Sequence, residues 1–237
     1  MEDMFSRSKM LIGDAQVELL SNKKVAVFGI GGVGGFTMEA LCRSGIGTLA
    51  LFDSDVVSVS NLNRQIIATN NSVGKDKVSV AKQRLLSINP NIRVDCYNIF
   101  YSMENANQFD LINYDYIVDA IDSVSSKILL IENAKKSGVP IISCMGTGGK
   151  MDISRLKVAD ISKTSGCPLA RVMRRELRAR NIQDLKVVYS DEEMITNSQI
   201  ESVKADGRRA PASMIFVPAV AGLMLANQVV KDLIGLN

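Results

Sequence analysis

The chain has 237 residues, of which 46% are hydrophobic, and its 28 Lys and Arg against 25 Asp and Glu give a net charge of +3. This length suits one α/β domain with elaborations or at most two small domains, and so small a charge argues against bulk coating by nucleic acid. Because the sequence contains no histidine, a Ser-His or Cys-His hydrolase is close to excluded.

Targeting signals and paired-cysteine motifs are also missing from the sequence. No apolar run approaches the roughly 18 residues that a membrane span needs, and the first ten residues lack the apolar core of a signal peptide. We therefore expect a cytoplasmic protein without a membrane span. None of the cysteines forms a CxxC pair, so neither a zinc site nor a disulfide framework is supported for Cys42, Cys96, Cys144 and Cys167.

The first half of the chain is organised around a strand, a glycine turn, a helix and a second strand. After a pair of lead-in helices in residues 1–22, we expect a strand at 25–28, the turn at 29–35, and a strand at 48–52 that ends at Asp53. Glycines let the backbone approach phosphates, and a helix N-terminus offers free N–H donors to an anion. The arrangement is typical of a nucleotide site. Its candidate binding glycines are Gly29, Gly31, Gly32 and Gly34.

A polar segment, residues 54–65, follows Asp53, and we expect it to be a functional loop at the carboxyl end of the second strand. Within it, Asn61 and Arg64 supply amide and guanidinium donors beside the presumed phosphate site. The next helix is expected over residues 78–88. Lys77 lies at its first turn, where the helix dipole disfavours a cation, and this placement indicates a nearby anion.

Alternating strands and helices continue through the middle of the chain. We expect strands at 92–98, 116–120 and 139–145, and helices at 103–110 and 128–136. This alternation predicts an α/β fold with a Rossmann-like, doubly wound and mostly parallel sheet. Ligands of such a sheet bind where the carboxyl ends of its strands converge.

The pattern changes after residue 150, and we expect antiparallel C-terminal additions to the sheet. An edge strand within 152–163 is followed by a basic helix that starts at Cys167, a short strand at 186–189 and a mobile polar loop at 191–211. An apolar helix that starts near Pro218 completes the chain. We interpret residues 1–237 as a single domain, in which 1–150 form the nucleotide-binding part and 151–237 the extension.

The basic helix has two readings that the sequence does not separate. Its arginines share a broad face, and they either contact RNA phosphates, together with Arg208 and Arg209, or form an ordinary solvated surface. The residues of that face are Arg171, Arg174, Arg175 and Arg178.

The choice of nucleotide depends on charges outside the glycine turn. The turn fits nicotinamide, flavin, S-adenosylmethionine and ATP alike, and the carboxylate of Asp53 suggests a ribose hydroxyl in any of them. Arg64 and Lys77 add cations for a third phosphate, and Asp122 is available to hold Mg²⁺. This combination favours ATP over a dinucleotide.

Five spaced motifs resemble those of the adenylating enzymes related to ubiquitin-activating enzyme. They are GxGGxG at 29–34, Asp53-Ser-Asp55, Ser60-Asn61-Leu62-Asn63-Arg64-Gln65, Gly74-x-x-Lys77 and Asp119-Ala-Ile-Asp122. The resemblance implies a homodimer in which Arg7 reaches into the ATP site of the partner. It also implies that Asp53 binds the ribose, that Asp122 binds Mg²⁺, and that the remaining contacts come from Asp55, Asn61, Arg64 and Lys77.

The C-terminal third resembles the tRNA threonylcarbamoyladenosine dehydratase branch of these enzymes. The similarity rests on the runs at 167–178, 187–190 and 213–226. It implies that a carboxylate on a modified adenosine in tRNA is adenylated by ATP, and that the adenylate cyclises with net loss of water. The branch more often has Asp at the position of Cys167. We interpret Cys167 as an ordinary loop residue in preference to a thioester-forming nucleophile.

Three other functions remain as alternatives. The second hypothesis is adenylation of a ubiquitin-like sulfur-carrier protein, although the two CxxC zinc pairs typical of those enzymes are absent. A nicotinamide oxidoreductase is disfavoured by Arg64 and Lys77, and a non-catalytic nucleotide sensor would not need Asp122. A sulfur-relay or carrier partner is left open.

Overall fold

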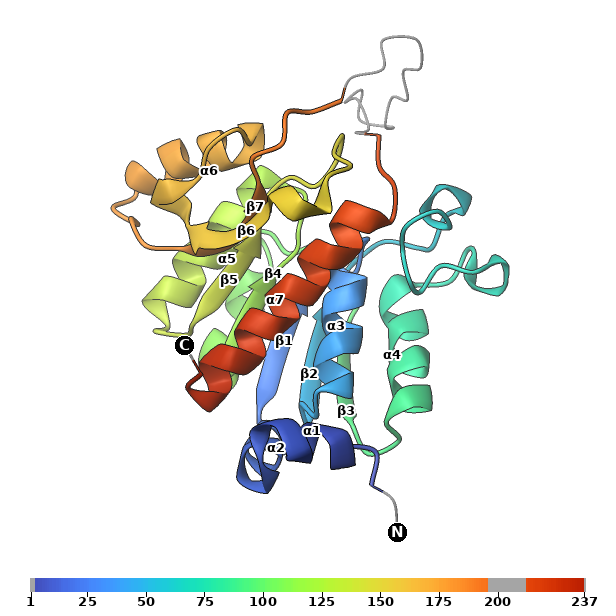
Figure 1. Ribbon diagram of the computed structural model, residues 1–237. Helices are drawn as coiled ribbons and strands as arrows, with labels where there is room; N and C mark the ends of the chain where they lie inside the picture. The colour runs from blue at the N-terminus through green and yellow to red at the C-terminus, as the bar shows by residue number, and fades with distance from the viewer. Residues whose placement is uncertain (1–2, 196–211, 237) are drawn as a thin grey trace.

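The computed structural model describes residues 3–195 and 212–236, and its centre is a seven-stranded sheet (Figure 1). The strands are β1 (Lys24–Phe28), β2 (Thr48–Phe52), β3 (Arg93–Tyr97), β4 (Tyr116–Asp119), β5 (Ile141–Cys144), β6 (Leu156–Asp160) and β7 (Lys186–Ser190). Their order is β3-β2-β1-β4-β5-β7-β6, and every neighbouring pair is parallel except β6 with β7. The expected Rossmann-like α/β sheet with an antiparallel addition is confirmed.

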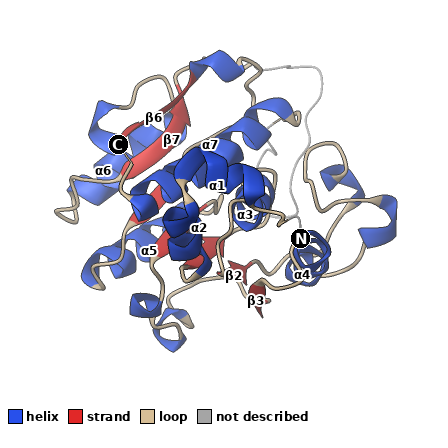
Figure 2. Cartoon of the chain, turned by 60° about the horizontal axis from the view of Figure 1, so that its bottom comes forward, coloured by secondary structure: helices blue, strands red, loops and turns tan. Residues whose placement is uncertain are grey.

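Helices cover both faces of the sheet (Figure 2). They are α1 (Ser6–Ile12), α2 (Asp14–Ser21), α3 (Gly34–Arg43), α4 (Lys77–Ile88), α5 (Val124–Lys136), α6 (Pro168–Arg178) and α7 (Phe216–Ile234). One hydrophobic core joins the sheet to α3, α4 and α7, and a second joins the opposite face to α5 and α6. The expected lead-in helices, α1 and α2, lie below the amino ends of the strands in Figure 1.

The central strands are short apolar runs because helices bury them from both sides. In β1, the four residues 25–28 have no exposed surface, and all four residues of β4 are buried. The rings of Phe28 and Phe52, from neighbouring strands, stack with their centroids 4.1 Å apart. This packing fixes the carboxyl ends of β1 and β2 side by side.

Two helix predictions were wrong in detail. Residues 103–110 contain no α-helix but a 3₁₀ turn at Ala106–Gln108. There the Asn105 side chain accepts from the Ser102 N–H at 3.0 Å and donates to the Phe100 carbonyl at 2.9 Å, which offers the backbone an alternative to a helix. Helix α5 begins four residues before the predicted 128, because the Ser123 hydroxyl caps it.

The C-terminal additions belong to the same sheet as the first five strands. Strand β7 pairs with β5, and β6 completes the edge. The division at residue 150 therefore stays a prediction about sequence segments, since the sheet runs across it. Of the expected mobile loop at 191–211, residues 196–211, including Arg208 and Arg209, lie outside the described residues.

Helix α7 is the longest helix of the described residues. It has 19 residues, and an 18-residue window within it has a mean hydropathy of 1.3. By length and composition alone it would be able to cross a membrane, contrary to the sequence expectation that no run comes close. However, α7 packs along α3 and the sheet, and the buried residues along it include Val217, Leu225 and Val229. This burial is what the core helix of a globular fold requires.

Candidate nucleotide site

The site predicted from the sequence lies at the switch point of the sheet. From β1 the chain moves outward to β2 and β3, and it then returns to place β4 on the other side of β1. Ligands of doubly wound sheets bind at the carboxyl ends of strands at such a point. The glycine turn follows β1, Asp53 follows β2, and Asp122 lies three residues beyond the end of β4.

The glycine turn is held against the end of β4 by close backbone contacts. Gly29 has a φ of +88°, and a Cβ atom there would lie 2.6 Å from the Ala120 carbonyl oxygen. A Cβ on Gly34 would lie 1.8 Å from the Gly29 carbonyl oxygen. Only glycine fits at these two positions, which is why the turn brings the start of α3 so close to the strand ends.

Asp53 joins the glycine turn to the following loop. Its Oδ2 accepts from the Ile30 N–H at 2.6 Å, and its Oδ1 accepts from the Asp55 N–H at 2.8 Å. The side chain is 9% exposed, and this burial raises the pKa of Asp53 although Lys77 opposes the rise. The carboxylate is therefore largely buried between the glycine turn and the following loop, where the sequence predicted a ribose contact.

Lys77 faces two carboxylates. Its Nζ lies 2.6 Å from Asp55 Oδ2 and 3.7 Å from Asp53 Oδ1, and its own side chain is only 6% exposed. The sequence indicated an anion beside this lysine, and in the structure that anion is the Asp55 carboxylate, which is 68% exposed. Because Asp55 reaches solvent, its carboxylate is able to turn away from Lys77.

Arg64 lies beside the glycine turn. A Cβ on Gly32 would lie 3.6 Å from Arg64 Cγ and 3.3 Å from the Cβ of Pro218 in α7. The Arg64 guanidinium donates through Nη1 to the Ser60 carbonyl at 2.6 Å and to Asn63 Oδ1 at 2.9 Å. The structure thus brings Arg64, Lys77 and Asp53 together around one turn.

Asn61 lies in the same loop but is turned inward. Its Oδ1 accepts from the Ser58 N–H at 3.1 Å, and the residue is 9% exposed. In this arrangement Asn61 supports the loop that carries Arg64. A direct phosphate contact from Asn61 remains a prediction.

Gln65 is a site residue to which the sequence reasoning gave no role of its own. It is 7% exposed and lies beside Gly31, where the nearest atom to an added Cβ would be Gln65 Nε2 at 3.9 Å. Its Oε1 is a buried acceptor without a hydrogen-bond partner in the described part of the chain. A buried acceptor without a partner beside the glycine turn suits a ligand that brings a hydroxyl or amino donor.

The donors available for Mg²⁺ suit a cation that arrives with a triphosphate. Asp122 is exposed at the carboxyl end of β4. Within residues 3–195 and 212–236, no group of three or more Cys, Asp or Glu side chains forms a ready metal cage. Mg²⁺ is commonly bound by one or two carboxylates and substrate phosphates, which is the fit that Asp122 offers.

Arg7 and Cys167 lie away from the glycine turn. Arg7 is an exposed residue of α1, near the amino ends of the strands, so within one chain it is at the opposite edge of the sheet. Its role in a partner's site stays a prediction. Cys167 is 3% exposed and belongs to the hydrophobic core under α6, beside Gly146, which agrees with a packing role for its sulfur.

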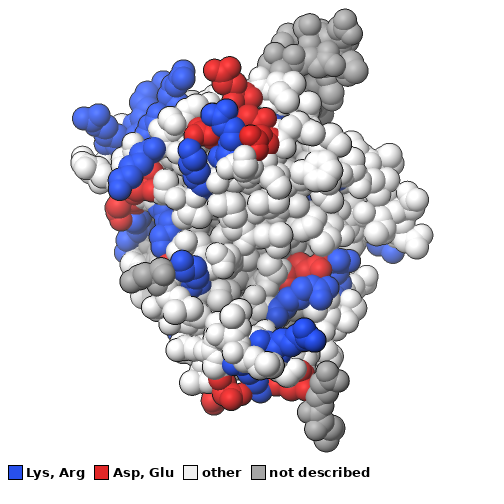
Figure 3. Space-filling model, in the orientation of Figure 1, with Lys and Arg blue, Asp and Glu red and all other residues white. Residues whose placement is uncertain are grey.

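The arginines of α6 do not all point outward. Arg174 donates to the Thr164 carbonyl at 2.7 Å, so it ties the helix to the preceding loop and leaves the predicted face. Arg171, Arg175 and Arg178 are exposed, and Arg175 also pairs with Glu176 at 2.8 Å. Lysines and arginines gather at the upper left of Figure 3, on the side of the molecule that carries α6.

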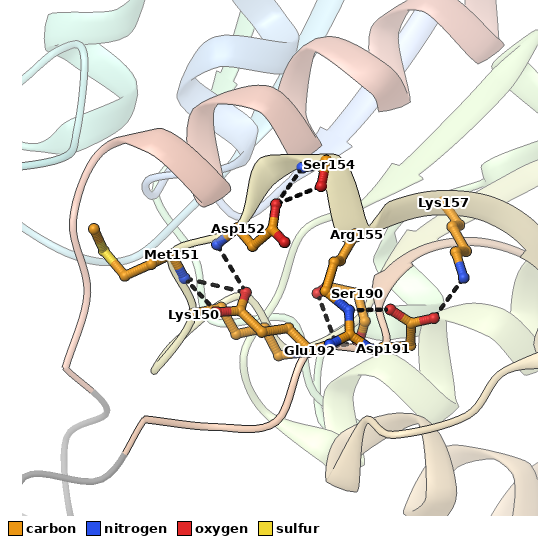
Figure 4. Close-up of polar contacts among 9 residues, drawn as sticks. All are labelled: Lys150, Met151, Asp152, Ser154, Arg155, Lys157, Ser190, Asp191 and Glu192. Atoms are coloured by element: carbon orange, nitrogen blue, oxygen red, sulfur yellow. Dashed lines mark hydrogen bonds and ion pairs between the residues drawn. The ribbon is translucent and has the colours of Figure 1, made fainter.

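A second polar cluster lies at the carboxyl end of β7 (Figure 4). The Glu192 carboxylate accepts from the N–H groups of Met151 and Asp152 at 2.9–3.1 Å, and the buried Lys150 donates to the Ser190 carbonyl at 2.6 Å. Beside them the Asp191 carboxylate pairs with two cations of the edge strand region, those of Arg155 and Lys157. The cluster fastens the segment after β5 to the segment after β7.

Comparison with known proteins places these features in a family. The sequence pattern of the ThiF family matches residues 5–237. The chain is 41% identical to the tRNA threonylcarbamoyladenosine dehydratase of Bacillus subtilis (strain 168), in an alignment that covers 97% of this chain and 94% of that protein. It is 38% identical to the Escherichia coli (strain K12) protein of the same name, over 74% of this chain and 65% of that protein.

Solved structures agree with the sequence comparison. The E. coli tRNA N6-threonylcarbamoyladenosine dehydratase TcdA, in complex with ATP, superposes with a TM-score of 0.87 at 32% identity, covering 98% of this chain and 94% of that one. E. coli MccB in complex with ATP superposes with a TM-score of 0.69 at 21% identity, which shows a shared fold alone.

Proposed function

This chain belongs to the ThiF family, and we propose that it removes water from N6-threonylcarbamoyladenosine in tRNA in an ATP-dependent reaction through a carboxyl adenylate. The observation that carries the proposal is the 41% identity to a protein named for this activity, over nearly the whole length of both chains. The geometry supports it, because the candidate ATP-binding side chains meet at one turn.

Binding of ATP follows from the contacts around the glycine turn. The carboxylate of Asp53 accepts a hydrogen bond from a ribose hydroxyl, and the N–H groups at the start of α3 face the phosphates. Lys77 leaves the exposed Asp55 carboxylate and binds a phosphate oxygen in its place. The Arg64 guanidinium likewise leaves the Ser60 carbonyl of its own loop and binds a second phosphate oxygen. The orphaned Gln65 Oε1 then gains a donor from the nucleotide.

Adenylation follows from this arrangement. The substrate carboxylate attacks the α-phosphorus, the bond to the bridging oxygen breaks, and pyrophosphate leaves. Arg64 and Lys77 stabilise the negative charge that develops on the phosphate oxygens. When bound through Asp122 and the phosphates, Mg²⁺ would supply further neutralisation of that charge.

Cyclisation needs no protein nucleophile. A group of the same modified nucleoside attacks the activated carbonyl, and AMP leaves with the oxygen that the carboxylate lost. The intramolecular geometry supplies the rate advantage of a tethered reactant. This step agrees with a chain that has no histidine and whose Cys167 lies in a hydrophobic core.

A homodimer is the second part of the proposal. The amino-terminal end of α7 exposes apolar side chains, with Ile215, Phe216 and Leu223 between 39% and 51% exposed. Figure 3 views the face that carries α7, and its centre is largely free of charged side chains. A second copy that covers this face would allow Arg7 of one chain to approach the site of the other.

The test is mass spectrometry of tRNA nucleosides after incubation of threonylcarbamoyladenosine-containing tRNA with ATP, Mg²⁺ and the purified protein. We expect threonylcarbamoyladenosine to lose the mass of one water, with AMP and pyrophosphate formed in equal amounts. Replacing Lys77→Met should lower the rate by about 10²–10³-fold, as for the loss of one donor to a developing oxyanion. Lys75→Met, an exposed lysine two residues earlier, is the matched control and should keep wild-type turnover.

A different substrate would give a different result in the same assay. ATP–pyrophosphate exchange that requires a carrier protein with a Gly-Gly tail, and that ignores the modified tRNA, would contradict the proposal. It would assign the chain to the activators of sulfur carriers instead.

A further inference from the structure

A fully buried ion pair lies under the turn that carries Asp122. Asp119 is the last residue of β4, and Lys127 lies in the first turns of α5. Lys127 Nζ is 2.9 Å from Asp119 Oδ2, and neither side chain has any exposed surface. The pair is therefore in the molecule's interior, at the same edge of the sheet as the nucleotide site.

The pair binds both backbone polar groups of one residue in this turn, Ile121. Asp119 Oδ1 accepts from the Ile121 N–H at 3.1 Å, and Lys127 Nζ donates to the Ile121 carbonyl at 3.0 Å. The remaining carboxylate oxygen accepts from the hydroxyl of Ser143 in β5 at 2.5 Å. Ile121 immediately precedes Asp122, so the ion pair fixes the backbone from which the Asp122 side chain projects.

The same turn is fixed to the glycine turn on its other side. The Ala120 N–H donates to the Phe28 carbonyl at 2.8 Å, and the Ala120 carbonyl oxygen lies 2.6 Å from the position that a Cβ of Gly29 would take. The end of β4 is thus held from below by the ion pair and from the side by the phosphate-binding turn. The position of Asp122 relative to that turn is determined by both contacts.

Stability does not account for this arrangement. The free energy lost when two charges are removed from water can exceed the attraction between them. Replacement of a buried ion pair by well-packed apolar residues is therefore often neutral or stabilising. Lys127 also lies near the N-terminus of α5, where the helix dipole opposes a cation. Because Asp119 is buried and both its oxygens are occupied, it cannot bind the nucleotide directly.

We propose that Asp119 and Lys127 are positioning residues that hold the backbone of Ile121 so that the Asp122 carboxylate faces magnesium on the triphosphate. This inference rests on the proposed function, in which Asp122 binds Mg²⁺ together with ATP. It assigns the pair no contact with substrate. Its effect is on how much Mg²⁺ strengthens the binding of ATP.

The experiment is calorimetric titration of ATP, with and without Mg²⁺, and of AMP, into the wild type and the double variant Asp119→Leu with Lys127→Met. The double variant removes both charges together and fills their space with apolar side chains, and it also removes the contacts to the Ile121 backbone and to the Ser143 hydroxyl. In the wild type, Mg²⁺ raises the affinity for ATP by some factor. We expect this factor to be at least tenfold smaller in the double variant, while the affinity for AMP changes less than twofold. A folded double variant with the wild-type Mg²⁺-dependent gain would overturn the inference, and so would an equal loss of AMP affinity.

A matched control removes an ion pair elsewhere on the sheet. Lys186, at the amino end of β7, pairs with Asp232 of α7 at 2.6 Å. The double variant Lys186→Met with Asp232→Leu should leave the Mg²⁺-dependent gain intact. If the Asp119 double variant does not fold, Ser143→Ala replaces it, because this change removes one support of Asp119 and leaves both charges. We expect it to reduce the gain by about twofold to threefold, and an unchanged gain would overturn the inference.

The wild-type titration separates the two proposals. A wild type that does not bind ATP, or binds it equally with and without Mg²⁺, contradicts the proposed role of Asp122 itself. A wild type with a clear Mg²⁺ effect that the double variant retains leaves the proposed function intact and contradicts only the positioning role.

Discussion

Two clusters of charged residues lie at the same edge of the sheet and differ in how far water reaches them. In the first, Asp119 and Lys127 are completely buried. In the second, Asp191 pairs with Arg155 and Lys157, whose side chains are about half exposed at 47% and 51% (Figure 4). The first cluster lies at the end of the central strand β4, beneath the nucleotide site, and the second lies at the ends of the outer strands β6 and β7.

The comparison shows that similar ion pairs constrain the backbone to different degrees. In the buried cluster, water cannot replace a lost partner, so each charge must keep its protein contacts and the turn at Ile121 stays in one place. In the exposed cluster, water and salt compete with the pairs, which makes their contribution small. Burial, and not the number of pairs, separates the two.

The largest expected effect is that of breaking the buried pair. Lys127→Met leaves the Asp119 charge buried without a cation, which should lower the free energy of unfolding by about 3–5 kcal/mol. Urea denaturation followed by circular dichroism measures this change. Adding Asp119→Leu should restore most of the loss, because both charges are then removed. If Lys127→Met lowers the free energy of unfolding by less than about 1 kcal/mol, the buried pair contributes no more than an exposed one.

A smaller effect is expected from Cys167→Ala, at a position that is buried at the same edge but carries no charge. Loss of a well-packed sulfur should lower the free energy of unfolding by about 1 kcal/mol, while turnover of tRNA stays within about twofold of the wild type. Steady-state kinetics with the modified tRNA checks it. Complete loss of activity in a folded variant would instead establish a covalent role for Cys167.

The smallest effect is expected from Asp191→Asn in the exposed cluster. Hydrogen bonds from Lys157 and Arg155 lower the pKa of Asp191 to about 2. A lowered carboxyl pKa gives stability that is present above the ordinary value near 3.8 and is lost as the pH falls through about 2. The melting temperatures of wild type and variant should therefore differ slightly at pH 7 and converge near pH 2. If the difference in melting temperature instead grows as the pH falls, the Asp191 carboxylate does not stabilise the fold through these ion pairs.

Much of the site was predictable because its residues follow strand ends in a fixed order. Gly29, Asp53 and Asp122 each come after a buried apolar strand, and parallel strands bring their carboxyl ends to one edge. Arg64 and Lys77 were placed there by their position in the loop and at the start of α4. In the structure, Arg64 lies beside the glycine turn, where a Cβ on Gly32 would lie 3.6 Å from Arg64 Cγ.

The parts that the sequence did not predict depend on contacts between distant segments. The pairing of Lys127 with Asp119 follows from how α5 packs on β4, although a lysine within an otherwise apolar helix face was a signal. Asp55 as the anion at Lys77 depends on how the loop folds back. The hydrogen bond from Arg174 to the Thr164 carbonyl depends on a turn before α6, which the helical periodicity of the sequence does not specify.

The close approach of Gly29, Gly34 and Ala120 has a consequence for motion at the site. With no space for even one methyl group between these backbones, the glycine turn and the end of β4 must move as one rigid unit. We therefore expect that exchange of nucleotide does not require opening of the turn. We expect it to follow reorientation of side chains at its border, such as the partly exposed Arg64 and the exposed Asp55, on the nanosecond timescale of surface rotamers.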